Sequence, residues 1–438
     1  MSSKLTITTV AALLLCGFAH ANATSLPVPD GNHAVGVVRA EFVDDSRKLD
    51  AADPASGPRR IPAVVWYPAK GKPSKEAAAY LPEEIAATTL PALARNFGYA
   101  AEDVAPVGTA RVQVRAGAPE ARSRSGFPVV VFSHGLFLYP EQNTALATHL
   151  ASHGYIVISI AHPGDSTDVR LQNGRLVPTL LTSEGDDPRF AESFKAIAAG
   201  ADAASIRKAL QVYREATGST RLGRSLVQWR EDTMAVARAI TNHAEPQSLH
   251  RALAGADRGR LAFAGMSFGG ATAATTCKRV DACRAAVNLD GQNFDPDLFD
   301  QSVERPLLLL LSDWPRYGLL AGQPRDVDFS PNDLAYERWS GAGADSDVLR
   351  VRLQGIRHLG FTDLVALLEG PKRDERVGDI AGDQALTALN DLTLAFLDVH
   401  LRDGDASRIA SAIKGHPVLQ SHVPTRLQEW MRDDAKTD

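Results

Sequence analysis

The sequence predicts a protein of the α/β class, with a mostly parallel central sheet flanked by helices. Residues 127–135 (FPVVVFSHG) and 155–164 (YIVISIAHPG) are short apolar runs, and the helix-like segment 140–154 lies between them. A strand, a helix and a second strand in this order form a parallel unit with a crossover helix. The apolar residues run continuously instead of alternating with polar ones, which indicates strands covered on both faces.

The other elements follow from the same patterns. Further strands are expected at residues 34–45, 60–69, 260–266, 284–291, 305–313 and 349–358, and a last helix at 385–402. Residues 70–126 are rich in Ala, Pro and Gly and are expected to be mostly irregular. Apolar residues at helical spacing, among them Phe190, Phe194 and Ile197, predict a helical insertion at about residues 165–224 that acts as a lid or cap.

Composition fits one large globular domain. The chain has 438 residues, of which 44% are hydrophobic and 23% charged, so a sizeable core is expected. The formal net charge is −5 and the sequence contains no basic block, which argues against nucleic acid as a partner. We expect residues 24–438 to form a single domain.

The first 23 residues are typical of a signal peptide. A short cationic start (MSSK) precedes an apolar run and a small-x-small site, ANA, that ends at Ala23. The apolar run is too short for a stable membrane span. Cys16 raises the question of a lipid anchor, but the bulky Leu15 before it is a poor match to such a site. The sequence therefore predicts an exported protein, periplasmic or secreted.

Cys277 and Cys283 would be the cysteines of the exported chain. Two nearby cysteines in an oxidising compartment often form a disulfide, and here it would join the end of a helix to the next strand. The alternative is a pair of buried thiols. We expect the disulfide on the grounds of the compartment.

The stretch GMSFGG, residues 265–270, places Ser267 between glycines at the point where a buried strand turns into a helix. Such a turn forces strained backbone angles on the serine and requires small neighbours, and it exposes the hydroxyl beside a helix N-terminus. Gly-x-Ser-x-Gly alone is a weak signal, and a tight structural turn is the alternative reading. The position between strand and helix favours Ser267 as a nucleophile.

A nucleophilic serine needs a histidine base and an acid that orients the base. His358, after the last predicted strand, is the expected base, whereas His400 lies late in the last helix. Two acids follow strands after the serine, Asp290 in NLDG and Asp313 in LLSDW. Spacing alone does not decide between them.

Three segments resemble the platelet-activating factor acetylhydrolase family of α/β-hydrolases. They are VVFSHGLFLYPEQNTALATHLASHGYIVISIAHPGDST, GMSFGGATAATTCKRVDACRAAVNLDG, and PLLLLLSDW together with HLGFTD. The resemblance implies an α/β-hydrolase fold with Asp290 as the acid and the backbone N–H groups of Leu136 and Phe268 as the oxyanion hole. It also implies short acyl chains, acetyl or oxidised, on phospholipids or small esters as substrates. The helical insertion and the long spacing from Asp290 to His358 depart from the family pattern.

Other functions are also compatible with parts of the sequence. A polyester, amide or peptide hydrolase would use the same three residues, and a non-catalytic binding protein would keep the fold without needing them in order. His134 is expected to bond to the loop backbone. His149 and His153 have the spacing of two zinc ligands but lack the glutamate of that motif, so a solvated helix face is expected. We expect neither a metal nor an organic cofactor.

Overall fold

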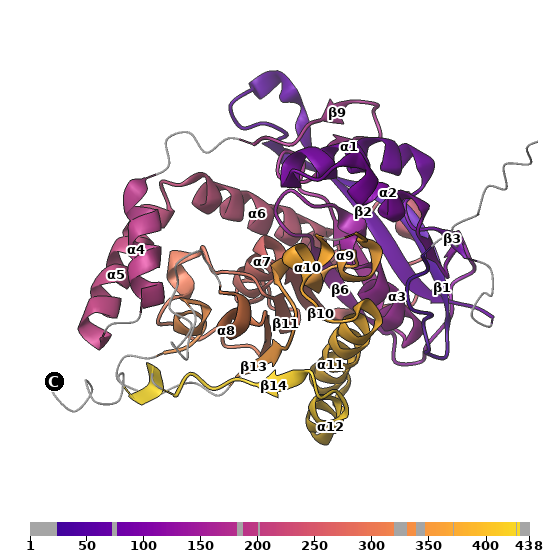
Figure 1. Cartoon of the computed structure of the whole chain (residues 1–438). Coiled ribbons are helices and arrows are strands. Elements are labelled where there is room, and N and C mark those ends of the chain that lie inside the picture. Colours follow the sequence, from indigo (N-terminus) through magenta and orange to yellow (C-terminus); the bar gives the residue numbers. More distant parts are fainter. Residues whose placement is uncertain are drawn as a thin grey trace, which may run out of the picture.

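A ten-stranded sheet runs through the centre of the part of the chain that the structure describes (Figure 1). Across the sheet the order is β14 (Leu419–Ser421), β13 (Val348–Leu353), β12 (Leu307–Leu311), β11 (Cys283–Leu289), β10 (Ala256–Met266), β6 (Phe127–Ser133), β7 (Ile156–Ile160), β2 (Pro58–Ala69), β1 (Ala34–Lys48) and β5 (Arg115–Ala116). The six strands from β13 to β7 are parallel to their neighbours, and β2 and β14 pair with them antiparallel. The predicted mostly parallel sheet is confirmed.

The computed structural model describes residues 24–71, 77–181, 187–199, 202–318, 331–338, 347–370, 372–425 and 427–429. The predicted signal peptide at residues 1–23, with Cys16 in it, lies outside the described residues. So do residues 182–186 and 200–201 of the predicted insertion. Among the described residues no helix has both the length and the apolar composition to cross a membrane.

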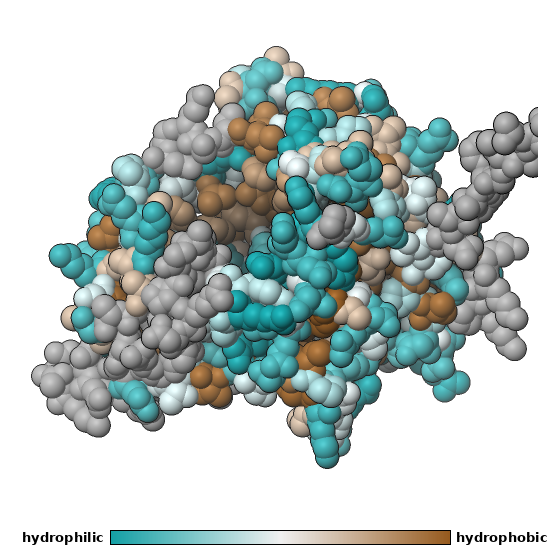
Figure 2. Space-filling view, in the orientation of Figure 1, coloured by the Kyte–Doolittle hydropathy of each residue, from teal (hydrophilic) through white to brown (hydrophobic). Residues whose placement is uncertain are grey.

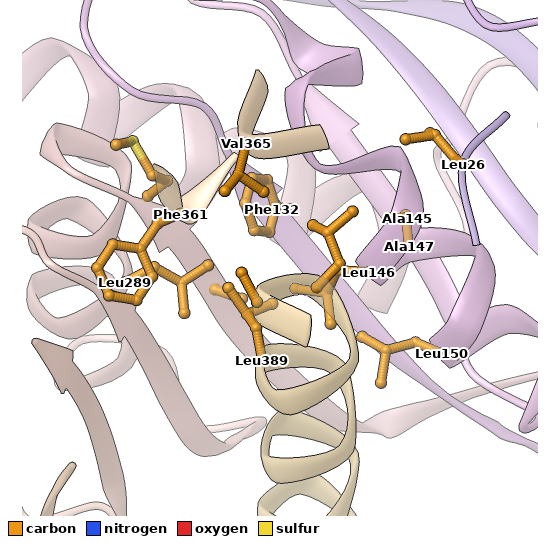
Figure 3. Close-up of a cluster of buried hydrophobic side chains, with 14 of the residues drawn as sticks. Leu26, Phe132, Ala145, Leu146, Ala147, Leu150, Leu289, Phe361, Val365 and Leu389 are labelled. Atoms are coloured by element: carbon orange, nitrogen blue, oxygen red, sulfur yellow. The ribbon is translucent and has the colours of Figure 1, made fainter. Parts of the chain in front are cut away.

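Both faces of the sheet are buried, because alternate residues of each strand point to opposite sides. In β6, Val130 and Phe132 belong to the core on one face, whereas Val129 and Val131 belong to the core on the other. The first face is covered by α1 (Glu83–Phe97), α2 (Ala101–Thr109), α3 (Thr144–Ser152), α9 (Leu364–Leu367) and α11 (Gly382–Arg402). Figure 3 shows Leu146 of α3, Leu389 of α11 and Phe132 pointing toward one another in this core.

The opposite face carries the helices that come from the middle of the chain. They are α4 (Pro188–Ala199), α5 (Ala203–Thr217), α6 (Arg221–Thr241) and α7 (Phe268–Cys277). The predicted insertion includes α4 and α5, which lie at the left of Figure 1. Phe194 and Ile197 of α4 are buried, as expected for a cap that packs on the core.

Smaller elements connect these layers. The two-stranded sheets are β3 (Ala78–Ala79) with β4 (Arg111–Val112) and β8 (Val169–Arg170) with β9 (Leu176–Val177). The short helices are α8 (Trp314–Tyr317), α10 (Arg373–Val377) and α12 (Ser407–Gly415), and single 3₁₀ turns include η2 (Pro140–Asn143) and η6 (His358–Phe361).

The expectation that residues 70–126 are mostly irregular is wrong. They contain α1 and α2, and each helix has a proline inside it, Pro91 and Pro106. Proline removes a backbone donor and disfavours helix interiors, which is why the sequence pattern pointed away from helix. The helices form because Leu93 of α1 and Val107 of α2 are fully buried in the core.

Candidate active site

Ser267 occupies a sharp turn between β10 and α7. Its backbone angles are φ 56° and ψ −123°, a conformation that a residue with a side chain rarely adopts. A Cβ at Gly265 would lie 2.3 Å from the carbonyl of Gly269, and one at Gly269 would lie 2.0 Å from the carbonyl oxygen of Ser133. Only glycine fits at these two positions, so they allow strand and helix to approach closely around the serine.

The structure brings Ser267, His358 and Asp290 into one hydrogen-bonded chain. Oγ of Ser267 lies 2.8 Å from Nε2 of His358, and Nδ1 of the same ring lies 2.7 Å from Oδ2 of Asp290. The three residues follow β10, β13 and β11, whose carboxyl ends meet at one edge of the sheet. The side chain of Asp290 is 3% exposed and that of His358 is 48% exposed, so the hydrogen-bonded chain runs from a buried acid to an open base.

Asp290 is held in place from two sides. Its backbone has φ 56°, a turn conformation directly after β11. Its second carboxylate oxygen, Oδ1, accepts a hydrogen bond of 2.8 Å from the N–H of Ser312. The carboxylate is therefore fixed with one oxygen on the backbone and the other on the imidazole.

Asp313, the alternative acid, faces a different partner. Its Oδ2 accepts a hydrogen bond of 2.8 Å from the N–H of Gly355, and its own N–H donates to the carbonyl of Ile356. The carboxylate thus holds the turn that leads from β13 to His358. The spacing of the sequence left both acids open, and the structure brings Asp290 to the histidine.

The two predicted oxyanion donors border the serine. Phe268 is the first residue of α7 and directly follows Ser267. Leu136 directly follows Gly135, and a Cβ added to Gly135 would lie 3.4 Å from the Cβ of Ser267. The side chains of Leu136 and Phe268 also pack in the same small cluster. Within the described part of the chain, neither backbone N–H donates a hydrogen bond to another protein atom. Both amides are thus left without a partner among the described residues.

A buried polar network, which the sequence did not reveal, joins the loop at Gly135 and Leu136 to the turn that carries His358. Gln142 accepts from the N–H of Gly135 at 2.9 Å and donates to the side chain of Asn143 at 2.8 Å. Asn143 donates in turn to the carbonyl of Phe361, three residues after His358, at 2.7 Å. Asp363 accepts from the first N–H groups of α3, at Thr144 and Ala145.

A second hydrogen-bonded set of serine, histidine and aspartate side chains lies next to the loop at Gly135 and is fully enclosed. Nε2 of His162 lies 3.1 Å from Oγ of Ser133, and Nδ1 lies 3.0 Å from Oδ2 of Asp232. None of the three residues is more than 1% exposed. Arg59, also buried, pairs with both carboxylate oxygens of Asp232, and Trp229 stacks on the His162 ring at 3.9 Å.

His134 has the structural role expected of it. Its Nε2 accepts the N–H of His162 at 3.2 Å, so Nδ1 carries the proton and donates to the carbonyl of Gly135 at 2.7 Å. Burial and the neighbouring His162 lower the pKa of His134 to about 3, which keeps the ring neutral. The ring therefore braces the loop next to Ser267.

Comparison with known proteins identifies the relatives of this chain. The family model described as "Platelet-activating factor acetylhydrolase, isoform II" matches residues 19–416. The chain belongs to this family. Curated relatives include the platelet-activating factor acetylhydrolases of Gallus gallus, 23% identical over 63% of this chain, and of Bos taurus, 22% identical over 64%. The matches span 62% and 58% of those relatives' own length.

A solved structure supports the fold assignment. A ferulic acid esterase from Streptomyces cinnamoneus superposes with a TM-score of 0.65 at 23% identity, covering 91% of this chain and 99% of that one. At this identity the likeness concerns the fold. The predicted α/β-hydrolase fold and the predicted resemblance to the acetylhydrolase family are both confirmed.

A cavity of about 570 Å³ opens over Ser267 and His358. Five aromatic residues are among those that line it: Phe97, Tyr99, Phe194, Phe294 and Tyr317. Phe194 belongs to α4, so the predicted insertion forms part of the wall. Figure 2 shows a hollow with hydrophobic surface on the face that Figure 1 presents.

Charged side chains also border this cavity. Arg357, Glu375 and Arg376 line it, and the two guanidinium groups lie over aromatic rings, 4.0 Å from the centroid of Tyr317 and 3.9 Å from that of Tyr99. The cavity therefore offers apolar surface beside the serine together with fixed charges.

Cys277 and Cys283 form the expected disulfide, with an S–S distance of 2.00 Å. It joins the last residue of α7 to the first residue of β11. Both cysteines are fully buried. The bond therefore fixes the connection between the helix that follows Ser267 and the strand that precedes Asp290.

The expectation that His149 and His153 lie on a solvated helix face is wrong for His149, whereas the side chain of His153 is 29% exposed. His149 is only 7% exposed, because residues of the N-terminal segment and of α11 cover this side of α3. Asp30 contacts both histidines, at 3.2 Å and 3.0 Å. Helical spacing placed the two rings on one face, but it could not show that a distant acidic residue lies against them.

Proposed function

We propose that the chain is a serine hydrolase of short-acyl carboxylic esters, with Ser267 as nucleophile, His358 as base and Asp290 as orienting acid. The observation that carries the proposal is the hydrogen-bonded chain of these residues at the floor of an open cavity. Membership of the acetylhydrolase family supports the reaction class.

In the proposed mechanism Nε2 of His358 takes the proton of Ser267 as the serine oxygen attacks the ester carbonyl. Asp290 accepts a hydrogen bond from Nδ1, which fixes the tautomer with a free Nε2 and stabilises the imidazolium that forms. The imidazolium then protonates the leaving alkoxide, and the acyl group stays on the serine. Water, deprotonated by the same imidazole, releases the acid. These steps require neither a metal nor an organic cofactor.

The tetrahedral intermediate carries negative charge on the former carbonyl oxygen. The N–H groups of Leu136 and Phe268 are proposed to receive it, since both border Ser267 and donate to no other atom of the described residues. Loss of one such donor typically raises the barrier by about 3 kcal/mol. The networks of Gln142 and His134 would hold the loop of Leu136 ready before the substrate arrives.

Substrates are proposed to be phospholipids or small esters with a short acyl chain, such as an acetyl or an oxidised chain. The names of the curated relatives support this class. Export is proposed from the signal-like pattern of residues 1–23, and the Cys277–Cys283 disulfide fits an oxidising compartment.

Labelling with a fluorophosphonate probe tests the nucleophile. The probe is expected to label the wild-type protein but not Ser267→Ala. It should also label Ser133→Ala, the matched control, which replaces the serine of the enclosed Ser133–His162–Asp232 set. Peptide mapping should place the adduct on Ser267. Labelling that persists in folded Ser267→Ala would refute the assignment.

A panel of nitrophenyl esters from acetate to palmitate, with an oxidised phospholipid beside it, tests the substrate class. We expect kcat/KM to be highest for the shortest acyl chains and to fall along the series. A flat response across the panel would refute the short-acyl preference without affecting the proposed nucleophile.

A further inference from the structure

Three side chains of the types that bind metal ions lie together on the outer side of α3. His149 lies in the last turns of the helix, His153 directly follows it, and Asp30 belongs to the N-terminal segment. Oδ1 of Asp30 lies 3.2 Å from Nδ1 of His149 and 3.0 Å from Nε2 of His153. One ligand atom of each residue lies within 4.8 Å of the other two.

We propose that Asp30, His149 and His153 bind one divalent transition-metal ion, with zinc as the favoured ion. Two imidazoles and one carboxylate are a ligand set that suits zinc, and a fourth position would be left to water. In a tetrahedral site with ligand bonds of 2.0–2.1 Å, neighbouring ligand atoms are about 3.3 Å apart. The two contacts of Asp30, at 3.2 Å and 3.0 Å, are close to this spacing.

The backbone holds Asp30 against the helix. Ser152 accepts two hydrogen bonds from the N-terminal segment, from the N–H of Gly31 to its Oγ at 3.1 Å and from the N–H of His33 to its carbonyl oxygen at 3.0 Å. The segment lies so close that a Cβ at Gly31 would be 2.3 Å from the Ser152 carbonyl. The backbone next to Asp30 is therefore held against α3 by contacts that do not depend on the histidines.

His149 also has the outer partner that a metal-bound imidazole requires. Its Nδ1 faces Asp30, and its Nε2 lies 3.7 Å from Oδ1 of Asp391, which in turn contacts Nε2 of His416 at 2.8 Å. Nε2 of His149 is buried and makes no hydrogen bond to the described residues. A small shift of the ring would let this N–H donate to Asp391, the carboxylate–histidine arrangement that orients metal ligands.

The local charges favour a cation here. Asp30 and Asp391 supply negative charge beside the two imidazoles. Arg402 is the nearby cation, but its guanidinium is bound to the carbonyls of His153 and Gly154 and to the carboxylate of Asp398.

The site lies at the opposite edge of the sheet from Ser267. Helix α3 runs from the carboxyl end of β6, near the loop of Gly135, back to the amino end of β7, and the histidines are at its far end. A metal there would tie the N-terminal segment to α3 and would take no part in ester cleavage. The proposal is thus independent of the proposed function.

Zinc binding by the purified, tag-free chain tests the proposal. After equilibrium dialysis against zinc chloride, elemental analysis is expected to find one tightly bound zinc per wild-type chain. Asp30→Asn and His153→Gln should each weaken that binding at least tenfold, since each removes one ligand. His250→Gln, an exposed histidine elsewhere on the chain, should bind as the wild type does.

Two further measurements make the result unambiguous. Cobalt in place of zinc should give the visible absorption of a tetrahedral ion in wild-type protein but not in Asp30→Asn. Zinc should raise the thermal midpoint of the wild type and not that of either ligand variant. If the wild type retains no zinc, or if both ligand variants bind it as tightly as the wild type, the proposal is refuted.

Discussion

Replacement of Asp290 by asparagine isolates the role of the acid. In the wild type Oδ1 accepts from the N–H of Ser312 and Oδ2 lies 2.7 Å from Nδ1 of His358. In Asp290→Asn the amide oxygen keeps the Ser312 bond, so the amide NH₂ faces the ring. Nδ1 must then accept a hydrogen bond, and the ring proton moves to Nε2. An imidazole with a proton on Nε2 cannot take the proton of Ser267.

The expected loss follows from this change of tautomer. In serine proteases the corresponding substitution lowers kcat by about 10⁴-fold, which equals about 5 kcal/mol of barrier. We expect a loss of that order in kcat for p-nitrophenyl acetate, with a normal thermal midpoint. Asp313→Asn is the matched control, because an amide oxygen can still accept the bond from Gly355, and it should keep at least about a third of wild-type kcat. Full activity in Asp290→Asn, or collapse in Asp313→Asn alone, would refute the assignment of the acid.

Three predictions concern stability, each measured by urea unfolding. Replacing Cys277 and Cys283 by alanine should lower the free energy of unfolding by about 2 kcal/mol, because the disulfide closes only a short loop; an unchanged midpoint would contradict this. The unfolded chain protonates His134 below its ordinary pKa of 6.5, whereas the folded chain does so only near 3, so stability falls as pH drops through this range. Lowering the pH from 7 to 4.5 should therefore reduce the free energy of unfolding by about 3 kcal/mol through this group. His134→Gln lacks the group, so its free energy of unfolding should fall by about that much less over the same pH range. Asp232→Ala should cost about 3–5 kcal/mol, since it leaves the buried guanidinium of Arg59 without its carboxylate; a cost below 1 kcal/mol would contradict the pairing.

The turn at Ser267 could be predicted from sequence because its signal is local. The glycines that make room, the strand before them and the helix after them all lie within about 20 residues of the serine. The signal for His358 is local too, because this histidine directly follows the last apolar run. The acid could not be chosen by this logic, because Asp290 and Asp313 each follow a strand. The folded turns decide between them, because Asp290 lies against the ring whereas Asp313 accepts from the N–H of Gly355.

Contacts between distant segments set the limit of what the sequence revealed. Asn143 and Phe361 are 218 residues apart in the chain, yet their hydrogen bond links the network at Gly135 to the turn that carries His358. Likewise, the spacing of His149 and His153 indicated only that they share a helix face. Asp30, which contacts them, lies 119 positions before His149 in the sequence. No local pattern encodes either contact, because each depends on how separately predicted elements pack together.

The two Ser–His–Asp chains at this edge of the sheet show why residue types alone do not define a catalytic site. In the enclosed chain the carboxylate of Asp232 is shared with Arg59, so its charge is already compensated, and the 1% exposure of Ser133 leaves no room for an ester. In the open chain no lysine or arginine of the described residues pairs with Asp290. Its negative charge is therefore left to stabilise an imidazolium on His358. Access to the cavity and an uncompensated acid, more than the presence of three matching side chains, favour Ser267 as the nucleophile.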